Sequence, residues 1–227
     1  MANKVAIFGA HGKVAQLLIS KLGSSKYEPL ALVRKQEQVD DFIAGGVDAK
    51  LISLEDDTLG KIAEAIKGCS AVVFSAGAGG KGGADRTVAV DLDSAVKAME
   101  ATELNNIKRF IMVSAIGADD RDFWYWNIPS LRTYYICKKY ADRELRRTNL
   151  DWTILQPGAL KDIPEKGSLQ PENEIFQTKT YETVGISRAD VAEVILQSLE
   201  HPSTIHKTLT LINGDVPIQK WIKNHKN

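Results

Sequence analysis

The segment Val5-Ala6-Ile7-Phe8-Gly9-Ala10-His11-Gly12-Lys13-Val14-Ala15 decides the fold of this 227-residue chain. A short apolar run leads into the pattern Gly-x-x-Gly-x-x-Ala, and a segment with helical periodicity follows. Gly9 permits a tight turn, and Gly12 lets a phosphate approach the backbone because no Cβ stands in the way. The free N–H groups and the dipole of a helix N-terminus favour an anion there. The segment therefore predicts a strand, a helix and, unless the loop is only a tight turn, a phosphate site formed by Gly9, Ala10, His11, Gly12, Lys13 and Val14.

Short apolar runs alternate with helical segments along most of the chain. We expect strands at Lys4–Gly9, Pro29–Val33, Ala49–Ile52, Ala71–Phe74, Arg109–Ser114 and Trp152–Gln156. We expect helices at Lys13–Leu22, Gln36–Ala44, Leu59–Ile66, Arg86–Thr102 and Tyr134–Thr148, with Ile136, Tyr140 and Leu145 of the last facing the sheet. Strands that are apolar without alternation are typical of parallel sheets covered on both faces. The pattern predicts a doubly wound, mainly parallel α/β sheet of the Rossmann type.

Three segments interrupt this rhythm. The loops Ser75–Gly83 and Asp119–Arg132 follow the fourth and fifth strands, at the edge of the sheet where open α/β folds bind ligands. The polar segment Pro157–Thr183 is expected to form an irregular cap on the substrate side of that edge. A helix at Arg188–Leu199 and a strand at Thr208–Ile212 follow. Because no repeat or linker divides the chain, we expect one domain over residues 1–227.

The composition favours a soluble protein of the cytoplasm. Lysine plus arginine and aspartate plus glutamate both number 29, so no net charge draws the chain to nucleic acid or to an anionic membrane. No apolar run approaches the ~20 residues that span a bilayer, and no secretory signal is recognisable at the N-terminus. The two cysteines, Cys69 and Cys137, suit a reducing compartment, and no metal-ligand spacing is found.

Arg34 indicates which dinucleotide the loop binds. It ends the second strand, about 20 residues after the glycine loop, where an NAD site usually places an acidic residue on the ribose 2′-hydroxyl. A guanidinium group instead suits the 2′-phosphate of NADP, which it can hold with two hydrogen bonds. The alternative is that Arg34 and Lys35 are solvated residues at the start of a helix. We expect NADP(H) as the cofactor.

The chain resembles a branch of the atypical short-chain dehydrogenase/reductase superfamily. The resemblance rests on Gly9-Ala10-His11-Gly12, Leu32-Val33-Arg34, Val72-Val73-Phe74-Ser75-Ala76-Gly77, Val90-Asp91, Arg109-Phe110-Ile111-Met112-Val113-Ser114, Leu150-Asp151-Trp152-Thr153-Ile154-Leu155-Gln156-Pro157-Gly158 and Ile186-Ser187-Arg188-Ala189-Asp190-Val191-Ala192. The branch is the NAD(P)-binding one related to NmrA-like proteins and biliverdin reductase B, and uncharacterised fungal members are most similar. The resemblance implies that Ser75, Ala76 and Gly77 line the cofactor and that Pro157 and Gly158 lie near the nicotinamide. The acidic residue that the branch often places near the adenine is Ser53 here.

The resemblance also points to a catalytic pair, because reductases of the wider superfamily use Tyr-x-x-x-Lys. Two overlapping matches exist, Tyr134 with Lys138 and Tyr135 with Lys139, and the family run Lys-x-x-Ala-Asp/Glu favours the first. Residues at i and i+4 share a helix face, and an ammonium group favours the phenolate form of a nearby tyrosine. Tyr134 would donate a proton to a carbonyl, and Lys138 would also hold the nicotinamide ribose. The alternative is that these residues belong to a solvated helix face.

The resemblance leaves the activity open. The fifth strand of the family often ends in two serines, of which the second usually polarises the carbonyl, and here the pair is Ser114-Ala115. Ser114 is therefore the remaining candidate for that role. We expect an NADPH-dependent oxidoreductase acting on a small carbonyl, quinone or flavin-like substrate. The alternatives are a non-catalytic NADP(H) sensor of the NmrA-like type with a protein partner, and a reductase that relies on cofactor positioning alone.

Overall fold

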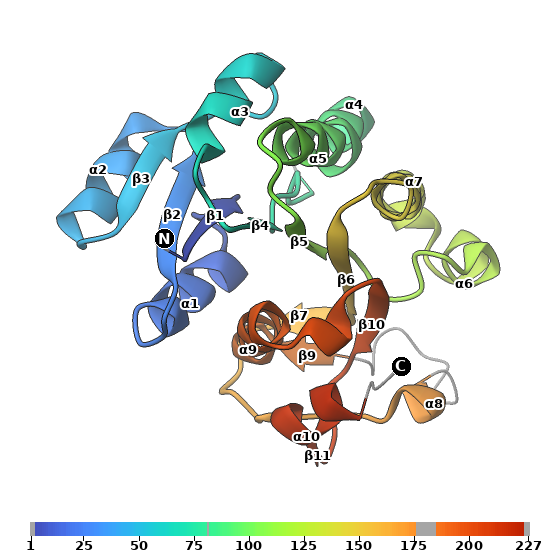
Figure 1. The fold of residues 1–227 in the computed structure, drawn as a ribbon. Helices are drawn as coiled ribbons and strands as arrows, with labels where there is room; N and C mark the ends of the chain where they lie inside the picture. The colour runs from blue at the N-terminus through green and yellow to red at the C-terminus, as the bar shows by residue number, and fades with distance from the viewer. Residues whose placement is uncertain (1–2, 81, 176–184, 225–227) are drawn as a thin grey trace.

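The computed structural model describes residues 3–80, 82–175 and 185–224. Its central sheet has seven parallel strands in the order β10-β6-β5-β4-β1-β2-β3 (Figure 1). The strands are β1 (Lys4–Phe8), β2 (Glu28–Val33), β3 (Asp48–Leu51), β4 (Ala71–Phe74), β5 (Arg109–Val113), β6 (Asp151–Pro157) and β10 (Lys207–Leu211). The expected parallel α/β fold is confirmed, and no strand end differs by more than one residue from its expected position.

Helices cover both faces of this sheet (Figure 1). One layer contains α1 (Lys13–Leu22), α2 (Gln36–Ala44) and α9 (Arg188–Glu200), and the other contains α3 (Leu59–Ile66), α5 (Ser94–Leu104) and α7 (Arg132–Leu145). Alternate residues of one strand enter the two cores: Val5 and Ile7 pack toward α1, whereas Ala6 and Phe8 pack toward α3 and α5. Apolar residues are therefore needed at positions 5 to 8 of β1, which explains the lack of alternation there.

The strand order places a binding crevice at the end of β1. This strand lies between β2 and β4: the chain adds β2 and β3 on one side of β1 and then crosses to add β4, β5, β6 and β10 on the other. Loops at such a switch point diverge and leave a crevice beyond the carboxyl ends of the strands. The glycine loop after β1, Arg34 after β2 and Ser75 after β4 all follow strand ends there.

In the middle of the chain, one expected helix is present but irregular, and one expected loop is wrong. The helix expected at Arg86–Thr102 consists of α4 (Gly83–Thr87), a π-helix η1 (Val88–Asp93) and α5, with its start three residues earlier. The loop expected at Asp119–Arg132 contains a helix, α6 (Arg121–Asn127), and the 3₁₀ turn η2 (Pro129–Leu131). The carboxylate of Asp120 caps α6 by accepting from the Phe123 N–H at 3.0 Å. Trp124 is 1% exposed in a small core of its own, which stabilises this helix.

The inward face of α7 also differs from the expected one. Leu145 is buried as expected and Tyr140 is partly buried, but Ile136 is 40% exposed. The residues that face the protein interior include Tyr135, Lys138 and Asp142, which fall at helical spacing. Ile136 therefore lies outside the buried face of α7, which includes a lysine and an aspartate.

The expected cap has short regular elements. Residues 157–175 contain β7 (Ala159–Lys161), β8 (Ser168–Leu169) and α8 (Glu172–Ile175). Both strands pair with later segments: β7 with β9 (Gly185–Ser187), and β8 with β11 (Val216–Pro217). Residues 176–183 of the expected cap lie outside the described part of the chain. The turn η3 (Pro202–Thr204) and the helix α10 (Ile218–Lys223) complete the fold. No helix in the described residues is long and apolar enough to cross a membrane.

Candidate functional site

The glycine loop forms the tight turn that the sequence predicts. Gly9 has a φ of +77°, and a Cβ added there would lie 2.7 Å from the Cα of Ala76. The N–H of Gly12 donates to the carbonyl of Gly9 at 2.9 Å, and Gly12 caps α1 in an extended conformation with φ −68°. Gly9 is therefore required for the fold itself, whereas the conformation of Gly12 is open to any residue.

This difference predicts that alanine at Gly9 mainly lowers stability, whereas alanine at Gly12 mainly weakens dinucleotide binding. Gly9→Ala should lower the free energy of unfolding by about 2 kcal/mol, because the left-handed conformation is strained and the Cβ meets rigid backbone. Gly12→Ala should cost less, about 1 kcal/mol, because its φ suits any residue and its Cβ would only approach the Gly9 carbonyl oxygen at 3.1 Å; it should weaken dinucleotide binding because Gly12 lines both cavities. Urea unfolding and calorimetric titration measure the two quantities, and equal destabilisation by both substitutions would contradict this assignment.

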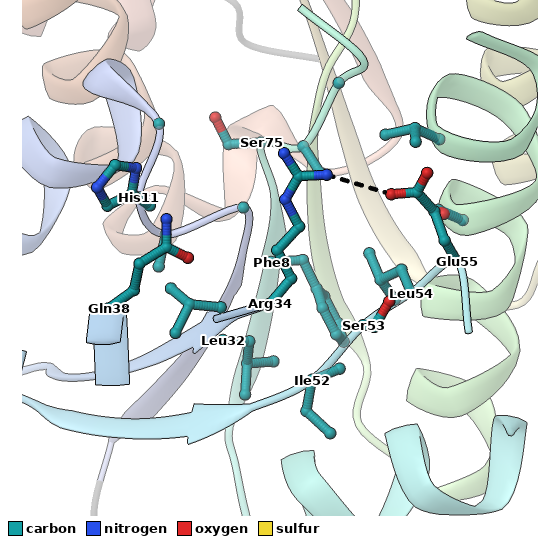
Figure 2. A pocket seen from close by; sticks show the side chains of 18 of the residues that line it. Phe8, His11, Leu32, Arg34, Gln38, Ile52, Ser53, Leu54, Glu55 and Ser75 are labelled. Carbon is teal, nitrogen blue, oxygen red and sulfur yellow. Dashed lines mark hydrogen bonds and ion pairs between the residues drawn. The ribbon is translucent and has the colours of Figure 1, made fainter. Parts of the chain in front are cut away.

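A cavity of about 230 Å³ lies on one side of the glycine loop. It is bounded by the loop, by the ends of β2 and β3, and by Arg86. Figure 2 shows Arg34 extending across this cavity toward Glu55, with His11 and Gln38 on the other side. Arg34 Nη1 lies 3.3 Å from Glu55 Oε2, and the Arg34 side chain is 53% exposed. Ser53, where relatives of the resembled branch often have an acid, lines the cavity and donates to Asp56 at 2.6 Å.

A second cavity, of about 940 Å³, lies on the other side of the loop. The two cavities share Gly12, Ser75, Ala76 and Gly77, so together they extend along the carboxyl edge of the sheet. Every site residue predicted from the sequence lines one cavity or the other. The second cavity contains Lys13, Val14, Ser114, Tyr134, Lys138, Pro157 and Gly158.

The geometry separates the two possible tyrosine–lysine pairs. Lys138 Nζ lies 5.5 Å from the ring centre of Tyr134, and both residues line the second cavity. Tyr135 also borders this cavity, but it is 1% exposed and stacks on Trp124 with ring centres 5.9 Å apart. Lys139 instead donates to the carbonyl of Asp119 at 2.8 Å. The arrangement therefore favours Tyr134 with Lys138 as the functional pair.

A buried carboxylate, not predicted as a site residue, holds Lys138 in place. Asp91 Oδ1 lies 3.2 Å from Lys138 Nζ, and the two side chains are 2% and 5% exposed. Asp91 Oδ2 accepts the N–H of Ala78 at 3.0 Å, and Lys138 also donates to the carbonyl of Val113 at 3.3 Å. Asp91 lies in η1, and π-helical turns are frequent at functional sites. The Val90-Asp91 match to the family was the only signal of this role in the sequence.

Ser114 is the least accessible of the predicted catalytic residues. It is 3% exposed, and its hydroxyl approaches the Asp142 carboxyl without completing a hydrogen bond of ordinary geometry. Burial raises the pKa of Asp142 to about 6, although the nearby Ser114 and Gln156 oppose the shift. Gln156 Nε2 donates to Asp142 at 2.9 Å. Ala115 takes the position where the family often has its second serine, so no hydroxyl is available from that residue.

The raised pKa of Asp142 predicts a pH-dependent gain from Asp142→Asn. Because ionisation of Asp142 is easier in the unfolded chain, its contribution to stability falls as pH rises from about 4 to about 6. Asparagine avoids this cost and can still accept from Gln156. At pH 7.5 the variant should gain up to about 3 kcal/mol in free energy of unfolding, and at pH 4 almost nothing. Urea unfolding at both values measures this, and an equal change at both would exclude ionisation as the cause.

A parallel sheet with a glycine loop at its switch point and two cavities joined there defines a dinucleotide-binding α/β protein. The chain belongs to the NAD(P)H-binding family, whose model matches residues 9–202. It is 51% identical over 225 residues to the UPF0659 protein YMR090W of Saccharomyces cerevisiae, covering 97% of this chain and 98% of the relative.

Two solved structures share this fold along almost their whole length. A putative NAD-dependent epimerase/dehydratase from Bacillus halodurans superposes with a TM-score of 0.87 at 38% identity, covering 98% of this chain and 100% of that one. The oxidoreductase ylbE from Lactococcus lactis superposes with a TM-score of 0.85 at 32% identity, covering 97% and 95%. In the described residues, no group of three or more histidine, cysteine, aspartate or glutamate side chains is placed to hold a metal.

Proposed function

We propose that this protein is an NADPH-dependent oxidoreductase that reduces a small carbonyl, quinone or flavin-like substrate. The observation that carries the proposal is the pair of joined cavities, with Arg34 at one end and Tyr134 and Lys138 at the other. The shared wall at Gly12 and Ser75–Gly77 would hold the pyrophosphate between these ends. The cavities thus offer a phosphate ligand and a proton donor on opposite sides of one loop.

The chain's own residues would supply the proton and the orientation. When bound, NADPH supplies the hydride that reduces the substrate. Tyr134 would donate its phenolic proton to the substrate oxygen, with the Lys138 ammonium stabilising the phenolate that remains. Lys138 is held by Asp91 and so has a fixed position from which to bind the ribose hydroxyls. The large cavity beyond this pair, lined by the turn η2 and by the segment that starts at Pro157, would select the substrate.

The preference for NADPH is tested by calorimetric titration with NADPH and NADH. Arg34→Ala should weaken NADPH binding by about 10-fold or more, because a charge-assisted contact with the 2′-phosphate is lost. NADH affinity should change by less than about twofold, since it has only a hydroxyl there. Lys35→Ala is the control, because Lys35 is exposed and outside both cavities. Equal affinity of the wild-type protein for both cofactors would contradict the preference.

One observation favours a second candidate, a non-catalytic NADP(H) sensor. Ser114 is buried beside Asp142 and residue 115 is alanine, so the usual carbonyl-polarising hydroxyl is missing. A screen of carbonyls, quinones and flavins for NADPH oxidation separates the candidates. A sensor must bind reduced and oxidised cofactor differently, since a ligand shifts an equilibrium only by its difference in affinity. Oxidation of NADPH with any of these substrates would favour the enzyme.

A further inference from the structure

Glu55 links two arginines across the smaller cavity. It follows β3, and its Oε2 lies 3.3 Å from Arg34 Nη1, at the end of β2. Its Oε1 accepts a hydrogen bond from Arg86 Nε, on α4, at 3.1 Å. The three side chains come from separate elements and all line the same cavity. Two guanidinium groups therefore converge on one carboxylate at the place proposed for the cofactor 2′-phosphate.

Arg86 is held in this position by the glycine-rich loop after β4. Its Nη1 donates to the carbonyl of Ala78 at 3.2 Å. A Cβ at Gly82 would lie 2.5 Å from Arg86 Cδ, so the arginine packs directly on the glycine backbone. The Arg86 side chain is 23% exposed, compared with 53% for Arg34. Arg86 is thus the more constrained of the two cations, and its direction toward the cavity is set by the fold.

Phosphate and carboxylate compete for the same donors. A phosphate monoester carries about two negative charges and three acceptor oxygens, which two guanidinium groups can share. The Glu55 carboxylate pairs with N–H groups of both arginines, which a phosphate would also need. Its negative charge would also repel a phosphate bound to the same arginines. A ribose 2′-hydroxyl carries no charge and meets no such repulsion.

We propose that Arg34, Glu55 and Arg86 together set the discrimination between NADPH and NADH. Arg86 is a second phosphate ligand, and Glu55 is a competing anion that the 2′-phosphate displaces from the arginines. Glu55 therefore limits the preference for NADPH that the two arginines create. This inference rests on the proposed binding of NADP(H), and it adds two specificity-determining residues to that site.

The test is calorimetric titration of purified full-length variants with NADPH and with NADH. Glu55→Gln should raise the ratio of NADPH to NADH affinity about fivefold, because a like charge is removed near the phosphate. Arg86→Ala should lower NADPH affinity about 10-fold and leave NADH affinity within about twofold. Glu64→Gln and Arg143→Ala are charge-matched controls on exposed residues outside both cavities, and neither should change the ratio.

The affinity ratios of the variants decide whether Glu55 and Arg86 set the preference for NADPH. An unchanged or lower ratio in Glu55→Gln overturns the proposal, as does an equal loss of both cofactors in Arg86→Ala, which would mean that Arg86 only supports the loop. If Arg86→Ala does not fold, Arg86→Lys replaces it, and its weaker hydrogen bonding should still lower NADPH affinity selectively. Failure of the wild-type protein to bind either dinucleotide contradicts the proposed function itself, whereas wild-type binding with an unchanged ratio in the variants contradicts this inference alone.

Discussion

Tyr134→Phe is expected to lower kcat by about 100-fold or more, while NADPH affinity stays within about twofold of the wild-type value. Positioned proton donors contribute rate factors of about 10² to 10⁴, and this substitution removes only the phenolic oxygen. The ring remains to line the cavity and to contact Lys138, whose Nζ lies 5.5 Å from the ring centre. Steady-state NADPH oxidation measures kcat, and calorimetry measures binding.

The neighbouring tyrosine supplies a matched control for this experiment. Tyr135 is buried against Trp124, and Lys139, its potential partner, contacts the carbonyl of Asp119. Tyr135→Phe should therefore retain kcat to within a few-fold. Because both tyrosines lie on α7, this variant also shows whether loss of a hydroxyl from that helix lowers activity in general. Full activity of Tyr134→Phe would eliminate Tyr134 as the proton donor and leave a reductase that depends on cofactor positioning.

The regular part of the fold could be predicted because each signal was local. The strand Ala71–Phe74 and the helices Lys13–Leu22, Gln36–Ala44 and Leu59–Ile66 have the predicted bounds. Their apolar residues pack on a sheet buried on both faces, so the burial pattern is visible in the residues themselves. The turn at Gly9 was equally local, since its φ of +77° requires glycine.

The short elements and several site contacts could not be predicted, because they depend on contacts between residues distant in the sequence. The strands β8 and β11 are two residues each, too short for any periodicity, and they exist because Leu169 pairs with Val216. The helix α6 required the burial of Trp124 among residues of other elements. In the site, the tyrosine–lysine spacing was visible, but the contact of Lys138 with Asp91, which lies in a π-helical turn of another element, was not. Glu55 likewise meets Arg34 because two neighbouring strands end together.

The Asp91–Lys138 pair should have the largest effect on stability of any polar contact in the site. Asp91→Asn keeps the shape of the side chain and its bond from the Ala78 N–H, but leaves the Lys138 ammonium without its counter-ion. Removing one partner of a buried ion pair typically costs about 3–5 kcal/mol. We therefore expect a loss of about 3 kcal/mol or more in the free energy of unfolding, measured in urea.

A double substitution distinguishes loss of the ion pair from general damage to the core. Lys138→Met alone leaves the buried Asp91 carboxylate without a counter-ion and should lower the free energy of unfolding by a similar amount. The double variant, Asp91→Asn with Lys138→Met, has no buried charge in this pair. The double variant should therefore be more stable than either single variant, with a coupling of about 2 kcal/mol or more in the mutant cycle. Additive losses would show that the residues act independently. In that case Asp91 would only anchor the loop through Ala78, and the fixed position of Lys138 would need another cause.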